Sequence, residues 1–287
     1  MINNANSGKR QRDNQPSEEI RIEGLHKAFG DHRVLRGIDL TIYRGDIIAI
    51  VGGSGCGKTV LLNHILGQVS PDAGRVLVTN HELPEKPLID LTRLSSDELD
   101  QVCQHWGVVF QRNALFSGSV YENMALWLRE IKNLDESEIK PIALSALKSV
   151  ALPQDEDFLT LAISDLSGGM AKRLAVARAI AMTPAVIFYD EPTTGLDPTS
   201  SAQIHDLIIA THFASREEGR ERTTVIITHD KDLLKRLKPR TVMLHEGKVY
   251  YDGSLNEFEK INSPITRPYF ELMPVLHQRL IDEKVSN

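Results

Sequence analysis

Residues 52–59 read GGSGCGKT, a glycine-rich stretch that ends in a lysine and a threonine. Glycines let successive backbone N–H groups turn towards one anion, and the lysine at this spacing reaches the β- and γ-phosphates of a nucleotide. The run DIIAIVG before the stretch predicts a strand buried on both faces, and a helix is expected over residues 58 to about 66. Because strand, loop and helix follow in this order, a chance glycine turn is a poor explanation. The sequence therefore predicts a phosphate loop formed by Gly52, Gly53, Ser54, Gly55, Cys56, Gly57, Lys58 and Thr59.

Two adjacent carboxylates, Asp190 and Glu191, follow the apolar run AVIFY. At the end of a buried strand they would be poorly satisfied as core residues. Asp190 can hold Mg²⁺ through water, and Glu191 can orient and polarise an attacking water, because phosphoryl transfer depends mainly on positioning. The alternative is a solvated turn before Pro192, which the phosphate loop makes the weaker explanation.

Gln111 and His229 each follow an apolar strand, in GVVFQ and VIITH respectively. A single polar residue at such a place usually caps the strand. A doubly wound sheet, however, holds its ligand outside the carboxyl ends of its strands. Their shared position makes both residues candidates for the same site.

The signature segment, residues 166–170 (LSGGM), opens a second helix with Ser167, Gly168 and Gly169. Free N–H groups and the helix dipole at such an end can hold an anion. No lysine accompanies this segment, and an ordinary serine-capped helix is the alternative. The chain thus carries two candidate anion-binding segments, and only the phosphate loop contains a lysine.

Together these motifs closely resemble the ATP-binding cassette (ABC) ATPases over about residues 20–253. The resemblance implies ATP and Mg²⁺ as ligands, and a dimer in which the signature segment of one chain closes over the γ-phosphate held by the other. It explains the missing lysine, because the partner's phosphate loop supplies it. It implies roles for further residues: catalysis by Glu191, His229 and Gln111, metal binding by Thr59, Gln111 and Asp190, adenine stacking on Phe29, and a partner contact at Asp197.

Met170 departs from the commonest signature, which has glutamine there. SGGM followed by Lys172-Arg173, together with FQRNALFSGSVYENMALWL, resembles the lipid-trafficking cassettes of the mammalian-cell-entry and maintenance-of-lipid-asymmetry type. That branch implies phospholipid transport by a separate membrane permease, with a lipid-binding mammalian-cell-entry type subunit as a further partner. It places the chain on the cytoplasmic face of the inner membrane. The apolar residues of 115–127 could receive a helix of the permease, or could be core of a helical subdomain.

Two other functions remain open from the sequence. One is the ATPase of an ABC importer for a small solute such as an amino acid. The other is a non-transport ABC ATPase acting on DNA or ribosomes, against which the net charge of −6 argues, because phosphate neutralisation needs a basic surface. We therefore expect no nucleic-acid partner.

Strands and helices alternate through the chain, which predicts an α/β fold with a parallel sheet covered on both faces. The resemblance implies a RecA-like P-loop NTPase core with an antiparallel β-subdomain and an α-helical subdomain. We expect a disordered polar tail over residues 1–17, a nucleotide-binding domain over 18–253 with its helical part at about 113–165, and a C-terminal helical extension over 254–287.

Local signals fix several element ends. Ser95 and Glu98 have capping-box spacing before a short helix. Asp197 and Pro198 form a strong helix start. A hairpin is expected to turn at Glu246-Gly247. The two cysteines, Cys56 and Cys103, suggest neither a disulfide framework nor a metal site, and no apolar run is long enough to span a membrane.

Overall fold

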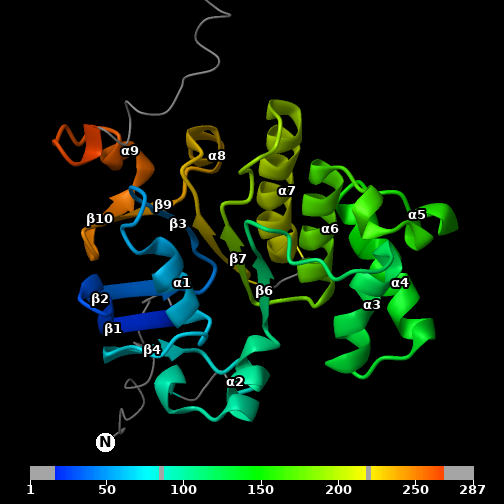
Figure 1. The fold of residues 1–287 in the computed structure, drawn as a ribbon, viewed down its shortest axis with the longest axis horizontal. Helices are drawn as coiled ribbons and strands as arrows, with labels where there is room; N and C mark the ends of the chain where they lie inside the picture. The colour runs from blue at the N-terminus through cyan, green and yellow to red at the C-terminus, as the bar shows by residue number, and fades with distance from the viewer. Residues whose placement is uncertain (1–16, 84–86, 218–220, 268–287) are drawn as a thin grey trace, which may run out of the picture.

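A six-stranded sheet lies at the centre of the computed structural model, which describes residues 17–83, 87–217 and 221–267 (Figure 1). Its strand order is β10-β9-β3-β8-β7-β6. Strands β9, β3, β8, β7 and β6 pair in parallel, and β10 pairs with β9 in the antiparallel sense. The strands are β3 (Ile47–Val51), β6 (Trp106–Val109), β7 (Val186–Asp190), β8 (Thr223–Ile227), β9 (Arg240–His245) and β10 (Lys248–Ser254). The parallel sheet and the hairpin at Glu246-Gly247 are thus confirmed.

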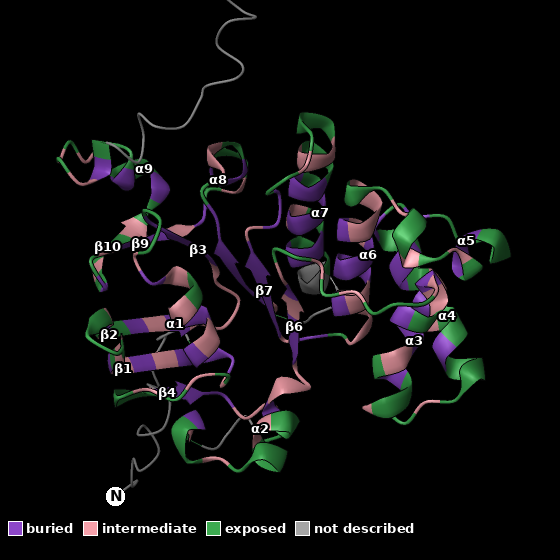
Figure 2. Ribbon diagram, in the orientation of Figure 1, coloured by how far each residue is buried: buried purple, intermediate pink, exposed green. Residues whose placement is uncertain are grey.

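Both faces of the sheet are buried at its central strands β3, β8 and β7, as Figure 2 shows, whereas the edge strand β10 is half-buried or exposed. In β3, Ile48 and Ile50 belong to one hydrophobic cluster, whereas Ala49 and Val51 belong to another. Because alternate side chains of a strand point to opposite faces, a strand buried on both faces reads as a continuous apolar run. The run DIIAIVG has this character for that reason.

One face is covered by helix α1 (Lys58–Ile65) and by a second sheet of order β2-β1-β4-β5. Its strands are β1 (Glu18–Phe29), β2 (His32–Tyr43), β4 (Ala73–Val78) and β5 (Ile89–Asp90), all paired antiparallel. The antiparallel β-subdomain is therefore present. After it come the short η1 (Leu91–Arg93) and α2 (Ser96–Cys103), and α2 begins with the expected capping box of Ser95 and Glu98.

The other face packs against α6 (Gly168–Ala181), α7 (Pro198–Glu217) and α8 (Lys231–Leu237). Asp197 accepts hydrogen bonds from the first turn of α7, as predicted. Beyond α6 lie α3 (Val120–Glu130), α4 (Glu136–Ser149) and α5 (Glu156–Thr160) (Figure 1), and the short η2 (Ile163–Asp165) follows α5 in the chain. The helical stretch expected from residue 113 begins only at Val120, because the capping box of Ser119 and Glu122 sets the start of α3.

The C-terminal extension contains one short helix in its described part, α9 (Leu255–Phe258). The rest of the expected extension and nearly all of the expected N-terminal tail lie outside the described residues, so these domain limits stay predictions. Within residues 17–83, 87–217 and 221–267, no helix is both long and apolar enough to cross a bilayer.

Candidate functional site

Four neighbouring parallel strands bring the predicted site residues to one edge of the central sheet. In the order β3, β8, β7 and β6, each strand is followed by a predicted site segment. Since the carboxyl ends of parallel strands meet at one edge, the phosphate loop, His229, the Asp190-Glu191 pair and Gln111 lie in a row. Residues spread over 178 positions of sequence thus form a single edge.

The phosphate loop is tightly packed beneath and open above. A Cβ on Gly52 would lie 2.7 Å from the Cys56 sulfur and closer still to the Leu244 carbonyl oxygen, whereas nothing lies within 4 Å of a Cβ on Gly53. Gly57 adopts the left-handed conformation as the N-cap of α1, with φ of 105°. No side chain caps α1 and its first turn carries no acid, so its N–H groups remain available to an anion.

Lys58 lies across this loop. Its ammonium donates to the carbonyl oxygens of Gly52, at 2.8 Å, and Gly53, at 3.2 Å. The neighbouring Thr59 is exposed, so its hydroxyl is accessible to a ligand. Phe29, at the end of β1, is 52% exposed, and the Lys27 ammonium lies over its ring, 5.6 Å from the ring centre.

Asp190 is buried at the end of β7. Burial raises the pKa of its carboxyl, and the charge of Glu191 raises it further, while the positive charges of Lys58 and Lys172 act in the opposite direction. The positive charge of the phosphate-loop lysine therefore acts on the ionisation of Asp190. A bound cation would favour the ionised carboxylate in the same way.

Glu191 and His229 form a direct pair. The Nδ1 atom of His229 lies 2.7 Å from Oε2 of Glu191. Glu191 has a positive φ of 46°, unusual for a residue with a side chain, and its N–H donates to the Ile227 carbonyl at 2.8 Å. The last residue of β8 therefore holds Glu191 beside His229, which follows the same strand.

Gln111 is exposed just after β6, and its main-chain carbonyl is hydrogen-bonded to a buried lysine of α6. The Lys172 ammonium donates to the carbonyls of Phe110 and Gln111, both at 2.9 Å. Lys172 is 2% exposed. Burial lowers the pKa of its ammonium to about 8, against the opposing effect of Asp190. The sequence reasoning noted this lysine only as part of a basic pair; the signal for burial was its i, i+4 spacing to Val176 on the buried face of α6.

Asp230 is a second residue that sequence reasoning missed. Its carboxylate accepts from Thr193 at 2.8 Å and His205 at 2.7 Å, and from the first turn of α8. Burial opposes ionisation, but the hydrogen bonds from His205, Leu233 and Thr193 outweigh it and lower the pKa of Asp230 to about 2. The helix-start chemistry of an aspartate before α8 was the available signal. Asp230 ties the segment of His229 to the segment that follows Glu191.

The signature segment lies apart from the chain's own phosphate loop. Ser167 caps α6 by accepting from the Met170 N–H at 3.2 Å. A Cβ on Gly168 would meet Leu196, and one on Gly169 would meet Ser200, so the neighbours of this segment lie at the start of α7. In Figure 1, α6 and α1 stand on opposite sides of strands β7 and β8. The structure therefore does not bring Ser167, Gly168 and Gly169 onto the anion site formed by Lys58.

The predicted metal ligands suit a Mg²⁺ ion that is bound by the protein and by the nucleotide phosphates together. Thr59 and Gln111 offer neutral oxygens and Asp190 one carboxylate. Through the described part of the chain, no group of three His, Cys, Asp or Glu side chains could hold a metal. Mg²⁺ is usually bound through one or two carboxylates and completes its shell with water and substrate phosphates, so a donor set with a single carboxylate fits a nucleotide-bound ion.

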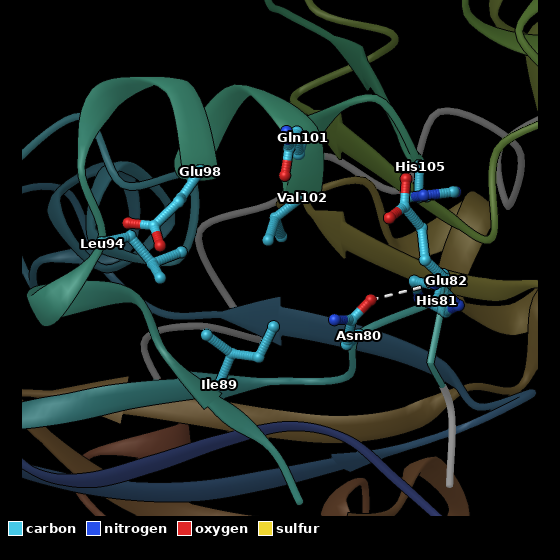
Figure 3. Close-up of a pocket in the computed structure, with 9 residues that line it drawn as sticks. All are labelled: Asn80, His81, Glu82, Ile89, Leu94, Glu98, Gln101, Val102 and His105. Carbon is cyan, nitrogen blue, oxygen red and sulfur yellow. Dashed lines mark hydrogen bonds between the residues drawn. The ribbon is translucent and has the colours of Figure 1, made fainter. Parts of the chain in front are cut away.

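A separate cavity of about 200 Å³ lies between β5 and α2 (Figure 3). Nine residues line it: Asn80, His81, Glu82, Ile89, Leu94, Glu98, Gln101, Val102 and His105. None belongs to the four segments at the sheet edge. This cavity is a feature of residues 80–105 and not of the predicted site.

Comparison with known proteins follows the same motifs. The family model described as ABC transporter matches residues 35–194. Over 236 residues the chain is 36% identical to the intermembrane phospholipid transport system ATP-binding protein of Haemophilus influenzae, covering 82% of this chain and 83% of that protein. Over 262 residues it is 32% identical to Protein TRIGALACTOSYLDIACYLGLYCEROL 3, chloroplastic, of Arabidopsis thaliana, covering 87% and 72%.

A solved structure shares the fold. A dimeric ATP-binding cassette in a post-hydrolysis state, bound to ADP and Pi, matches with a TM-score of 0.69 and 29% identity. The match covers 82% of this chain and 98% of that one.

Proposed function

The chain belongs to the ABC transporter family as an ATP-binding, ATP-hydrolysing subunit, and we propose that it powers phospholipid transport by a separate membrane permease. The observation that carries the catalytic part is the 2.7 Å contact between Glu191 and His229 at the edge that holds the phosphate loop. The relatives carry the substrate part of the proposal. The alignment with the phospholipid transport protein of Haemophilus influenzae covers most of this chain and most of that protein.

Within the site, each side chain takes one task. The N–H groups of the phosphate loop and the Lys58 ammonium bind the β- and γ-phosphates, for which Lys58 leaves the Gly52 and Gly53 carbonyls. Glu191 orients and polarises the attacking water, and His229 holds the Glu191 carboxylate in place. Bound Mg²⁺, with Thr59, Gln111 and Asp190 as its protein ligands, would neutralise charge that develops on the phosphates.

Two copies are needed for a complete site in this proposal. The signature segment lies away from its own phosphate loop, and the N–H groups at the start of α6 carry partial positive charge towards solvent. A second copy would place these N–H groups on the γ-phosphate. The dimeric, ADP- and Pi-bound relative supports this arrangement.

A permease contact is supported by an exposed aromatic pair that follows Gln111 in the sequence. Phe116 and Trp127 are 42% and 41% exposed, and their ring centres are 6.2 Å apart. Arg178 lies 5.3 Å from the Phe116 ring. Exposed aromatic side chains next to an arginine are typical of interface centres. We propose that this patch receives the permease on the cytoplasmic face of the inner membrane, and that a lipid-binding mammalian-cell-entry type subunit joins the same assembly.

The experiment is isolation of the complete transporter from membranes through a tag on this chain. We expect a permease to copurify, and phospholipid to raise the ATPase rate of the reconstituted complex. Stimulation by a small solute with its binding protein, and none by phospholipid, would replace the lipid assignment with a small-solute importer. Absence of any membrane protein would reject the transport proposal, whereas the ATPase assay of the chain alone would be unaffected.

A further inference from the structure

We propose that Lys172 is a positioning residue for ATP hydrolysis, which fastens the signature helix α6 to the segment that carries Gln111. Neither the family resemblance nor the comparisons assign it a task. The proposal starts from its environment, because it is a buried charged side chain that the catalytic scheme above does not use.

The geometry of Lys172 is that of a clamp. Its ammonium lies 2.9 Å from two consecutive carbonyl oxygens, those of Phe110 and Gln111, more than sixty residues away in sequence. The side chain is 2% exposed, so water does not compete for these bonds. Because two carbonyls of one segment share a single ammonium, the link fixes both the distance and the orientation of that segment relative to α6.

A buried ammonium is a costly way to join two segments. A methionine has a similar length and would fill this space without desolvation of a charge. In the described part of the chain, the ammonium of Lys172 donates to these two carbonyls, and the charge of Asp190 acts on it without a direct ion pair. The interaction that compensates the charge is therefore the pair of carbonyl bonds. Hydrogen bonds to a charged donor are stronger than those between neutral groups, which makes the clamp stiff.

The two segments that Lys172 joins have different proposed contacts, one with the permease and one with the nucleotide of the partner chain. Gln111 lies at the sheet edge, five residues before Phe116, and the patch of Phe116 and Trp127 is where the permease is proposed to bind. Lys172 stands in the second turn of α6, whose first residues would meet the partner's nucleotide. A displacement of the Gln111 segment would therefore be passed to α6 through one side chain.

This inference rests on the proposed role of Gln111, and the experiment separates the two. Full-length protein is assayed for Mg²⁺-ATPase activity as wild type, Lys172→Met, Gln111→Ala and the double variant. We expect Lys172→Met to lower kcat about tenfold with little change in KM for ATP, since small misplacements of reacting groups lower rates strongly. In the Gln111→Ala background, the same change should lower kcat by less than about twofold, because residues that act through one another are not additive.

Rescue and control variants complete the test. Lys172→Arg keeps a long cationic donor and should recover most of kcat. Lys148→Met removes an exposed lysine of α4 and should leave kcat unchanged. If Lys172→Met is not folded, Lys172→Gln, which retains an amide donor, takes its place in the cycle.

Three results would overturn the inference. The first is a kcat for Lys172→Met close to that of wild type. The second is an equal loss in the wild-type and Gln111→Ala backgrounds, which would make Lys172 an independent structural residue. The third is failure of Lys172→Arg to restore activity. Normal activity of Gln111→Ala alone would reject the role of Gln111, and then the clamp would have no catalytic consequence.

Discussion

The Nδ1 atom of His229 and the Oε2 atom of Glu191 are 2.7 Å apart, although the two residues follow different strands. His229 follows β8 and Glu191 follows β7, and the hydrogen bond between the Glu191 N–H and the Ile227 carbonyl holds these strand ends together. His229 is 57% exposed and Glu191 15%, so the histidine lies on the solvent side of the carboxylate. The pair defines where water would be activated.

The first prediction concerns Glu191. Glu191→Gln should keep the affinity for ATP and lower hydrolysis by about 10²–10⁴-fold, the usual range for a positioned acid–base group. The amide retains the shape of the side chain and removes its basicity. Nucleotide titration and a phosphate-release assay measure the two quantities, with Glu130→Gln on the exposed side of α3 as control. Near-normal turnover would remove Glu191 from the mechanism.

The second prediction concerns Lys58, the lysine of the phosphate loop. Lys58→Ala should lose nucleotide affinity and activity together, because the ammonium is the charge that the loop presents to the phosphates. Equilibrium binding of ATP to the purified variant is the direct measurement. Binding at wild-type affinity would contradict the phosphate role of Lys58.

The third prediction compares two neighbouring glycines. Gly52→Ala should lower the free energy of unfolding by about 1–3 kcal/mol, because the methyl group would meet the Leu244 carbonyl and the Cys56 sulfur at a φ of 148°. Gly53→Ala should change it little, since nothing lies within 4 Å of its Cβ. Urea unfolding of both variants measures the difference. Equal losses would mean that the loop is not packed as described.

The fourth prediction concerns Asp230 and pH. Its pKa is lowered from 3.8 to about 2, so the ionised form stabilises the folded state by about 2 kcal/mol at neutral pH. Because the folded pKa lies below the unfolded one, this contribution is complete above about pH 4 and is lost as the pH falls towards 2. Asp230→Asn should therefore be destabilised at pH 7, and the difference from wild type should shrink over that acidic range.

Denaturant unfolding at several pH values tests the role of Asp230. Asp157→Asn, at an exposed position of α5, serves as control. If the difference in unfolding free energy between wild type and Asp230→Asn stays constant from pH 7 down to pH 2, the partners of Asp230 do not stabilise its ionised form.

Local signals in the sequence predicted the elements well where one short motif sets an end. The capping box of Ser95, the Asp197 cap and the turn at Gly247 are all present. The sequence also predicted that the site residues share one edge of the sheet, because several apolar strands are followed by polar residues. The helical stretch was expected to begin at residue 113, but residues 113–118 precede the cap at Ser119, which sets the start of α3.

Contacts between distant segments could not be predicted from the sequence. The bond from Lys172 to Gln111 spans 61 positions, and the bond from Thr193 to Asp230 spans 37. The spacing of Lys172 to Val176 on α6 indicates that the lysine is buried, but nothing local in the sequence identifies the partner of Lys172 or of Thr193. The fold brings the partners together through the strand order β3-β8-β7-β6, which only the paired sheet reveals. The functional roles of the predicted site residues remain predictions, and the variants above test them.

The central claim is that ATP is hydrolysed between two copies of this chain, with Ser167 of one copy on the phosphate held by Lys58 of the other. The separation of α6 from α1 within one chain supports this claim (Figure 1). Specific ATPase activity of the purified full-length chain, measured over a wide range of protein concentration, tests it most directly. We predict that specific activity falls as the protein is diluted below its dimerisation constant, and that Ser167→Arg abolishes activity at every concentration. A monomeric ATPase whose specific activity is independent of concentration would contradict the claim.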